Sequence, residues 1–410
     1  MKSLTKLLTC CTLGLLGFAH ELRAQSIGHS AYNAFGLGTL EQVGLVPYEH
    51  MGYAAIGSRI DDVVNLENPA GLTSIRGFTH SFDFGLSFSQ LTQESPSDIS
   101  TGTFGGLHDL NVWFRLNQKT AISVGLSKYS DATFDILDRS TDGSESRLVG
   151  DGGSSQAFLA AGYSLLPNLH LGVQGSLLFG SLQREEFLTI SDPSAALQVT
   201  TTESFVKPLL KLGLQNEYKL GSKARVVLGA TYEAGGSTQV SIDEVITSSV
   251  SLGRDSLFSE DFSTLQLPQK IGFGIGIAMK SWNINLDYEL EDWATNEDRS
   301  RFSFQDRWLA SGGIQYRKDR FSSRMIERVA FRMGGGVHSN YVAADNESYL
   351  NPYFSLGMGI PLLKGAASIN VGYQYHTSGT TADNLIMENA HTFSFSLTIR
   401  DIWFGKRIYN

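Results

Sequence analysis

The chain has 410 residues, of which 41% are hydrophobic and 18% charged, and its formal net charge is −9. This acidic balance offers no basic surface for nucleic acid. Its two cysteines, Cys10 and Cys11, stand side by side near the N-terminus. Because the segment that carries them has the features of a cleaved signal, the mature chain has no thiol for a disulfide, a cysteine–zinc site or a nucleophile.

The first 24 residues have the layout of a secretory signal peptide. Lys2 and Lys6 precede an apolar run over 7–19, and Leu22-Arg23-Ala24 ends the segment. The run is shorter than the roughly 20 apolar residues that a membrane-spanning helix needs. We therefore predict cleavage after Ala24. Acylation of one of the cysteines, as in a lipoprotein, is the alternative, and Thr9 is a poor preceding residue for it.

The segment 25–77 shows no clean alternation of apolar and polar residues. It keeps many apolar residues and is rich in small ones, most densely at Met51-Gly52-Tyr53-Ala54-Ala55-Ile56-Gly57. Small residues let the backbone pack closely in a confined space. We predict that this segment is a plug, or hatch, in the bore of a barrel built by the rest of the chain. The alternative is a disordered periplasmic tail, which would lack the apolar residues.

From residue 78 onward, apolar and polar residues alternate at period two in fourteen stretches, with no helical domain between them. In the first stretch Phe82, Phe84 and Leu86 share one phase, and Asp83 and Gly85 share the other. Successive side chains of a strand point to opposite faces, so each stretch has an apolar and a polar side. The pattern predicts an all-β fold: a 14-stranded antiparallel transmembrane β-barrel over 78–410, with lipid outside and water inside. The predicted strands are 78–90, 105–117, 120–130, 155–166, 169–190, 201–220, 224–243, 263–280, 282–293, 303–317, 327–340, 351–360, 366–377 and 389–400.

The connectors alternate in length. Those after even-numbered predicted strands are tight, apart from 318–326, whereas those after odd-numbered strands are mostly long and polar, notably 131–154, 244–262 and 378–388. Short periplasmic turns and longer outer loops are typical of outer-membrane barrels. With an even strand count, both termini are then expected in the periplasm. Tyr and Trp near the strand ends indicate the aromatic belts of the two membrane interfaces.

The polar phase of the strands predicts residues that line the lumen. In a barrel of about eight strands the inward side chains fill the bore. A barrel of fourteen strands is wider, so a hatch is needed to close it. We expect the lining residues chiefly to anchor the hatch by hydrogen bonds, with substrate binding as the alternative. The candidates are Asp83, Arg115, Gln174, Asp287, Glu289 and Arg332.

Two motifs resemble the FadL-like family of outer-membrane channels for long-chain fatty acids and aromatic hydrocarbons. Asn68-Pro69-Ala70-Gly71-Leu72, just before the first strand, resembles the hatch of that family. Leu267-Pro268-Gln269-Lys270-Ile271-Gly272, running into Glu291-Asp292-Trp293, resembles its Leu-Pro strand entry and acidic–Trp strand end. The resemblance implies that Asn68 and Pro69 shape the hatch, Pro by fixing φ and Asn by bonding to nearby backbone. An ordinary turn leading into a strand is the alternative.

The resemblance also implies a function: passive uptake of hydrophobic small molecules across the outer membrane, with movement of the hatch and release sideways through the wall. FadL-like barrels also serve as non-transporting partners of larger outer-membrane secretion or assembly machines, which is the second hypothesis. The short outer loop 191–200 and the polar, acidic loop 131–154 depart from the channel pattern. A secreted soluble β-protein is the third hypothesis, but the outward phase is too uniformly apolar for open water.

No constellation for catalysis or metal binding stands out. The histidines are scattered, no Gly-x-Ser-x-Gly elbow occurs, and Gly150-Asp151-Gly152-Gly153 lacks the Lys and the helix of a phosphate-binding loop. The acidic residues over 243–261 show no EF-hand spacing. We therefore expect no enzyme activity, no cofactor and no metal; the expected partners are a hydrophobic ligand, outer-membrane lipid and another outer-membrane protein.

Overall fold

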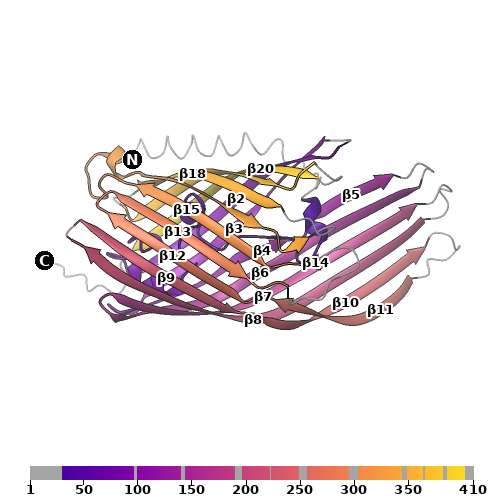
Figure 1. Cartoon of the computed structure of the whole chain (residues 1–410), viewed down its shortest axis with the longest axis horizontal. Helices are drawn as coiled ribbons and strands as arrows, with labels where there is room; N and C mark the ends of the chain where they lie inside the picture. The colour runs from indigo at the N-terminus through magenta and orange to yellow at the C-terminus, as the bar shows by residue number, and fades with distance from the viewer. Residues whose placement is uncertain are drawn as a thin grey trace.

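The computed structural model describes residues 30–401 except 97–98, 140–143, 190–195, 222, 249–255, 295–302, 344–348, 363–364 and 382–385. The predicted signal peptide, Cys10 and Cys11, and the first residues of the predicted hatch lie outside the described residues. The described part is a β-barrel with its first residues inside the bore (Figure 1). None of its helices has the length and apolar character needed to cross a membrane.

The barrel wall consists of antiparallel strands in which neighbours in sequence are neighbours in space. The first and last strands, β2 and β20, pair from His80↔Asp401 to Glu94↔Met387, which closes the cylinder. Fourteen strands cross the wall, and three of them are each broken into two consecutive segments: β4 with β5, β9 with β10, and β11 with β12. The predicted fold class is thereby confirmed. The wall segments are β2 (His80–Glu94), β3 (Ile99–Arg115), β4 (Thr120–Asp131), β5 (Phe134–Arg139), β6 (Glu145–Leu166), β7 (Leu169–Thr189), β8 (Ala196–Leu220), β9 (Ala224–Ala234), β10 (Gly236–Ser248), β11 (Ser256–Leu267), β12 (Lys270–Met279), β13 (Trp282–Glu291), β15 (Arg307–Tyr316), β16 (Ala330–Ser339), β18 (Leu350–Leu362), β19 (Ala367–Ser378) and β20 (Met387–Asp401).

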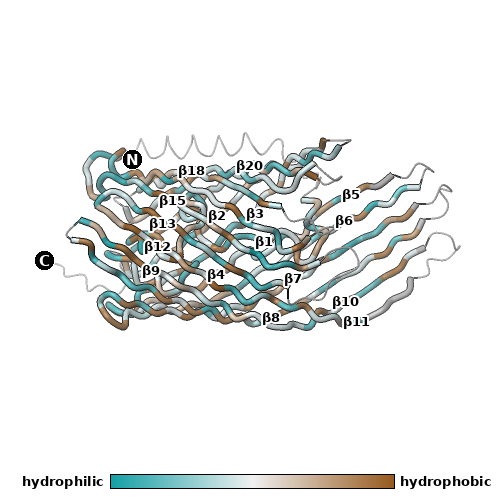
Figure 2. The backbone as a smooth tube through the Cα atoms, viewed as in Figure 1, coloured by the Kyte–Doolittle hydropathy of each residue, from teal (hydrophilic) through white to brown (hydrophobic). Residues whose placement is uncertain are grey.

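The alternation of side chains explains why the wall is stable in lipid. Large apolar residues of one phase stay exposed on the outer surface, among them Leu159, Leu177, Phe273 and Leu286. Apolar and polar residues alternate visibly along the strands (Figure 2). At the end of the barrel that carries the short turns, here called the short-turn end, Trp282 lies 4.6 Å from Tyr316 between ring centroids, as part of an aromatic belt.

One side of the wall continues beyond the rest of the barrel at the opposite, long-loop end. Figure 1 shows β5, β6, β7, β8, β10 and β11 extending there. The predicted loops 131–154 and 244–262 are therefore wrong in extent, because β5 occupies 134–139, β6 begins at Glu145, β10 ends at Ser248 and β11 begins at Ser256. The physical reason is that the outer parts of this extension do not alternate, because Leu148 and Val149 are neighbours in β6 and Val245 and Ile246 are neighbours in β10. Strands without a lipid-facing side give no apolar alternation.

The remaining elements are short. The segment before the barrel contains the 3₁₀ helix η1 (Ala31–Ala34), strand β1 (Thr39–Leu40), helix α2 (Val46–Glu49) and the 3₁₀ helix η2 (Pro69–Ser74). Near the long-loop end, β14 (Ser303–Phe304) pairs with β17 (Val342–Ala343). Helix α3 (Met325–Arg328) lies in the β15–β16 connector at the short-turn end.

Two interior clusters pack the segment 30–77 against the wall. One, near the long-loop end, joins Leu37 to inward residues such as Leu182 and Phe205, together with Trp293 and Tyr341. The other joins residues such as Leu66, Leu72 and Ile75 of the segment to Trp113 and Phe158 of the wall. The barrel therefore has an apolar core inside its bore, and part of that core comes from the N-terminal segment.

Candidate functional site

The hatch, defined here as residues 30–77, fills the bore over part of its height. Val46, Met51, Ile56 and Leu72 are fully buried, although they belong to a segment with hardly any regular structure. Their burial supplies the hydrophobic free energy that holds an irregular segment in place, about 1.5–3 kcal/mol for each large side chain. The hatch is thus a packed element of the interior.

A belt of glycines on the inner surface makes room for the hatch. A Cβ atom at Gly172 would lie 2.2 Å from the backbone N of Ala70, and one at Gly229 would lie 2.1 Å from the carbonyl O of Ile56. Hatch backbone therefore packs directly on strand backbone, closer than any side chain at these positions would allow. The glycines of this belt are Gly162, Gly172, Gly213, Gly229, Gly274, Gly276, Gly313, Gly334, Gly357 and Gly372.

The motif Asn68–Leu72 lies at the centre of the contact between hatch and wall. The Asn68 side chain donates to the carbonyls of Ile56 (3.0 Å) and Leu214 (3.1 Å) and accepts from the Ala70 backbone N (3.1 Å). Pro69 begins η2, where a missing N–H costs nothing. Ala70 and Leu72 are fully buried, and Gly71 packs on Asn65. The motif thus joins two hatch segments to strand β8.

Replacing Asn68 by alanine should loosen the hatch without preventing barrel formation. The change removes these hydrogen bonds and takes away the side-chain acceptor of the buried Ala70 backbone N, which costs about 1–3 kcal/mol. We expect faster amide hydrogen exchange over residues 56–72. Asn168→Ala is the control, because the side chain of that exposed turn residue donates to Asn216 of the wall (3.2 Å). Equal exchange in both variants would contradict the prediction.

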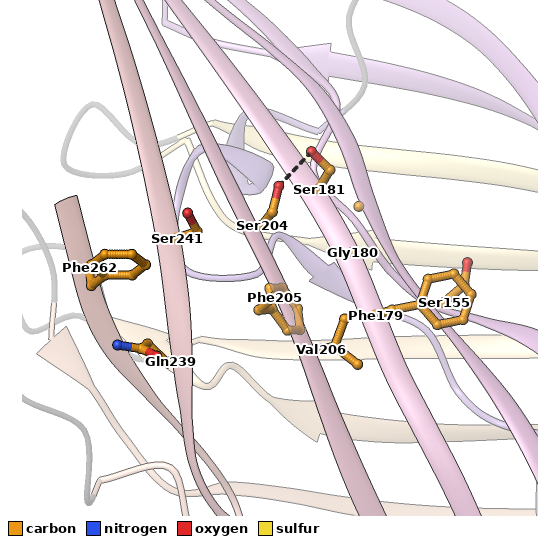
Figure 3. Close-up of a pocket in the computed structure, with 11 residues that line it drawn as sticks. Ser155, Phe179, Gly180, Ser181, Ser204, Phe205, Val206, Gln239, Ser241 and Phe262 are labelled. Atoms are coloured by element: carbon orange, nitrogen blue, oxygen red, sulfur yellow. Dashed lines mark hydrogen bonds between the residues drawn. The ribbon is translucent and has the colours of Figure 1, made fainter. Parts of the chain in front are cut away.

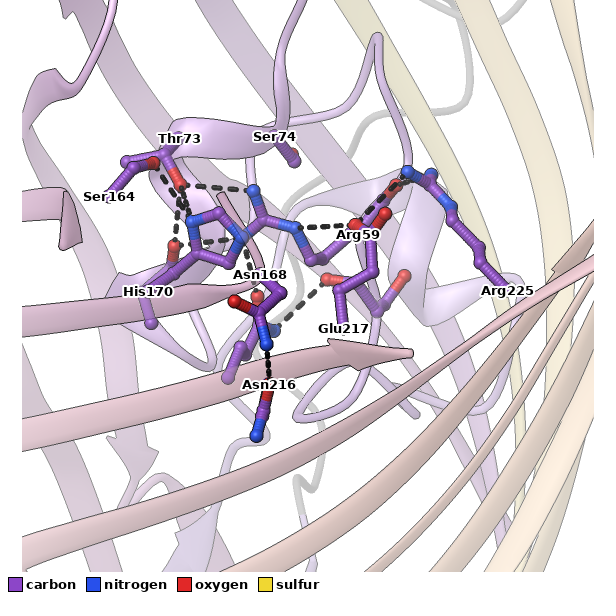
Figure 4. Close-up of polar contacts among 12 residues, drawn as sticks. Arg59, Thr73, Ser74, Ser164, Asn168, His170, Asn216, Glu217 and Arg225 are labelled. Carbon is purple, nitrogen blue, oxygen red and sulfur yellow. Dashed lines mark hydrogen bonds and ion pairs between the residues drawn. The ribbon is translucent and has the colours of Figure 1, made fainter. Parts of the chain in front are cut away.

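Charged pairs also fix the hatch to the wall. Glu67 of the hatch lies 2.5 Å from the Lys211 Nζ of β8, and both side chains are 8% exposed. On the same side, Arg59 lies 3.7 Å from Glu217, Arg225 donates to the Arg59 carbonyl (2.6 Å), and Arg59 donates to Thr73 (3.1 Å) (Figure 4). These pairs are largely out of water, so breaking one of them is costly.

Elsewhere in the bore, Asp62 and His50 also join the hatch to the surrounding barrel. Burial alone favours protonated Asp62, but the Arg317 guanidinium, 2.5 Å away, holds the pKa of that carboxyl below its usual range. Burial also lowers the pKa of His50 to about 3. The neutral imidazole lies 2.9 Å from Ser394 of β20. The hatch is therefore held on several sides of the bore.

The six predicted lumen residues fall on the inner surface, but only Asp287 bonds directly to the hatch. Its carboxylate accepts from the backbone N of Ala55 (2.5 Å) and of Ile56 (2.7 Å). Asp83 bonds to Ser81, and Gln174 bonds to Ser176. The two bonds of Asp287 join the wall to the hatch, whereas the bonds of Asp83 and Gln174 join residues of the wall to each other.

The other three candidates contact neighbouring wall residues. Arg332 donates to Gln315 (2.8 Å) and to Asn370 (2.9 Å). Arg115 lies over the Trp113 ring at 5.8 Å. Glu289 faces the charges of Glu67 and Lys211. Anchoring of the hatch by the predicted residues is therefore direct only at Asp287.

Sequence reasoning missed two wall residues that bind the hatch, Lys211 and Gln215. Lys211 and Gln215 of β8 share the inward phase, and Gln215 donates to the carbonyls of Ile56 (2.8 Å) and Ser58 (3.2 Å). Polar residues in the inward phase were the available signal. Their partners are about 150 residues away in the chain, with separations of 144 to 159, so spacing alone gave no indication of them.

The wall has a gap between β3 and β4 in its outer half. The two strands pair only from Asp109↔Ser127 to Arg115↔Ala121. Beyond this point β3 pairs with β2 alone within the described residues, and β4 pairs through Ser130 and Asp131 with β1 of the hatch. The hatch therefore contributes two residues to the wall, beside the part of β3 that pairs with β2 in the described residues.

A cavity of about 290 Å³ lies between this gap and the hatch. Its lining is mixed, with Tyr53, Leu91 and Phe104 beside polar residues such as Glu49 and His376. A second hollow, of about 640 Å³, is an open groove on the extended wall, where Phe179, Val206 and Phe262 meet a row of serines that includes Ser181 and Ser204 (Figure 3). Neither hollow resembles a deep apolar channel through the hatch.

Comparison with known proteins gives both a family and a fold. The model of the BamG family matches residues 5–410. Among solved structures, the CymD monoaromatic hydrocarbon channel is 19% identical, with a TM-score of 0.62 over 90% of this chain and all of that one. The toluene transporter TbuX of Ralstonia pickettii is 16% identical, with a TM-score of 0.59 over 88% of this chain and 99% of that one. A FadL homologue of Pseudomonas aeruginosa is 11% identical, with a TM-score of 0.63 over 88% of this chain and 99% of that one.

No curated protein matches the chain. Two of these solved structures are described as a hydrocarbon channel and a toluene transporter. At these identities the structural similarity establishes the fold, and it confirms the resemblance to FadL-like barrels of the outer membrane. The chain belongs to the BamG family and is an outer-membrane β-barrel with the FadL-type fold.

Proposed function

We propose that this chain is a non-transporting partner barrel of a larger outer-membrane assembly machine. The observation that carries the proposal is the fit of the hatch: it packs on the glycine belt from β6 round to β19, with its backbone against most of these glycines and the His50 ring against Gly357 and Gly372. The family whose model matches residues 5–410 is BamG. A barrel that is permanently closed suits a structural subunit.

Transport through the bore would require the hatch to leave its place. That movement would separate Glu67 from Lys211, Asp62 from Arg317, and Asp287 from the Ala55 backbone. Breaking one buried ion pair costs about 3–5 kcal/mol when a partner is left unpaired. Several such losses together oppose spontaneous opening, which favours a partner role over a passive channel.

The partner role predicts association in the membrane. Extraction of tagged chain in mild detergent, followed by native gel electrophoresis, should place it in an assembly much larger than 44.8 kDa, and mass spectrometry should find the same outer-membrane barrels and lipoproteins in each preparation. An unrelated abundant barrel from the same cells is the control. Migration of the chain alone, under conditions that preserve other complexes, would contradict the proposal.

A second candidate is passive uptake of hydrophobic small molecules such as long-chain fatty acids. It is supported by the short pairing between β3 and β4, which ends at Asp109↔Ser127, and by the cavity of about 290 Å³ beside it. Purified protein in liposomes should then speed the uptake of a long-chain fatty acid or toluene relative to empty liposomes. Uptake equal to the control across these ligands would reject this candidate and leave the partner role.

We also propose the orientation and the limits of the segments. The signal peptide is residues 1–24, the hatch is the segment 25–77, and the barrel starts at 78. Both termini lie in the periplasm with the short turns. N-terminal sequencing of the mature protein should begin at Gln25, and a tag at either end should resist protease added to intact cells.

A further inference from the structure

A small cavity at the short-turn end has an unusual lining. Its volume is about 70 Å³, and it lies between the hatch, the β15–β16 connector and the inner surface of β16 and β20. It has room for one small oxyanion group, since a water molecule occupies about 30 Å³ in the liquid. Five arginines line it: Arg317, Arg320, Arg328, Arg332 and Arg400.

Carboxylates of the hatch neutralise part of this charge. Arg317 donates to Asp62 at 2.5 and 3.2 Å, and Arg320 lies 3.2 Å from Asp61. Asp83 is the other carboxylate near Arg400. Among the described residues, five guanidinium groups thus face three carboxylates, an excess of two positive charges in a chain whose formal net charge is −9.

Two of the arginines have donors that no protein group uses. Arg400 is only 5% exposed, and its Nε has no hydrogen-bond partner within the described residues. The buried Nε of Arg328 likewise has no hydrogen-bond partner within the described residues. An unsatisfied buried donor on a charged group costs more than a neutral one. An anion in the cavity would satisfy these groups, and a planar carboxylate or a phosphate matches the guanidinium fork.

The surroundings indicate where the anion comes from. Arg332 and Arg400 belong to the inward phase of their strands, so the group must enter the mouth of the barrel. A phospholipid would have to move its headgroup away from the bilayer to reach them. The adjoining connector also exposes apolar side chains, with Phe321 88% and Ile326 66% exposed. Exposed apolar residues beside a charged pocket are typical of a protein contact.

We propose that this arginine pocket and the β15–β16 connector bind an acidic segment of a periplasmic partner protein. A carboxylate of that segment enters the pocket, and neighbouring apolar residues cover Phe321 and Ile326. The inference rests on the proposed partner function and names the chemistry of one contact. Charge complementarity carries it, because a cationic site is concentrated on a chain that is acidic as a whole.

The test uses purified full-length protein in detergent and a fluorescein-labelled decapeptide of alternating glutamate and phenylalanine. Fluorescence anisotropy should show binding that weakens about tenfold or more in the double variant R320Q/R328Q. The matched control is R324Q, because Arg324 lies in the same connector, is 79% exposed at its side chain and does not line the cavity. The control should bind within about twofold of the parent. Raising the salt concentration should weaken binding, as expected for an ion pair.

Other outcomes overturn the inference. Equal affinity in the double variant and in R324Q would exclude the pocket as the site. Stronger competition by phosphatidylglycerol vesicles than by unlabelled peptide would assign the pocket to a lipid headgroup, and competition by inorganic phosphate alone would assign it to a free anion. Unchanged heat-modifiable migration shows that each variant is folded. Peptide binding by a chain that migrates alone on native gels would support the pocket and reject the proposed function.

Discussion

Replacing Gly172 by leucine should prevent the barrel from closing around its hatch, whereas leucine at Gly175 of the same strand should be tolerated. A Cβ atom at Gly172 would lie 2.2 Å from backbone atoms of Ala70 and Pro69, while one at Gly175 meets nothing within 4 Å. Overpacking against movable side chains costs about 1–3 kcal/mol. Here the obstacle is backbone held by further contacts, so we expect a loss of stability above about 3 kcal/mol, beyond the usual range.

The comparison is made by refolding both variants from urea into detergent. Folded barrel is scored by its migration on gels without boiling, and stability is scored by the urea midpoint. Gly175→Leu should behave like the parent, because its side chain points to lipid. Refolding of Gly172→Leu with the yield and midpoint of Gly175→Leu would show that the hatch can yield, and the argument for a permanently closed bore would fail.

Replacing Lys211 by methionine should destabilise the protein more than any other single removal of a charge in the bore. Lys211 is the cation that faces Glu67 at 2.5 Å, and Glu233 and Glu289 lie within electrostatic reach of it. Loss of the lysine leaves Glu67 buried without a partner, which costs about 3–5 kcal/mol. The second change Glu67→Gln should restore most of the stability, because it removes the unpaired charge.

Urea unfolding of the single and double variants measures the coupling between the two sites. Lys207→Met is the control on the same strand, where the ammonium bonds to the Ser237 carbonyl at 2.8 Å near the surface. We expect it to change stability by less than about 1 kcal/mol. If Lys211→Met and the double variant are equally destabilised, the pair is not what holds this side of the hatch.

The sequence predicted the wall well because lipid on one side and a wet interior on the other impose period two. The alternation of Ile271, Phe273 and Ile275 with glycines marks β12 without ambiguity. The prediction failed for the outer parts of β6, β10 and β11, where apolar and polar residues both occur in each phase. A period can be detected only where the two faces of a strand meet different surroundings.

The candidate site was predictable in part. The motif at Asn68 and the inward phase of Asp287 were visible in the sequence, and the structure brings both to the hatch–wall contact. The glycines of the belt were visible as residues, but their purpose depends on hatch backbone far away in the chain. Contacts such as Glu67 with Lys211 join residues separated by 144 positions, and no local pattern encodes that pairing.

The two-residue strand β1 has a consequence for the order in which the molecule forms. Its pairing with Ser130 and Asp131 places Thr39 and Leu40 of the hatch in the cylinder itself, next to strands that are made later. The pairing of β2 with β20, which includes His80 and Asp401, then joins the first and last strands of the wall around the hatch. We expect the leading segment to act as a template during biogenesis, so that a chain synthesised without it would stall as an unsealed sheet.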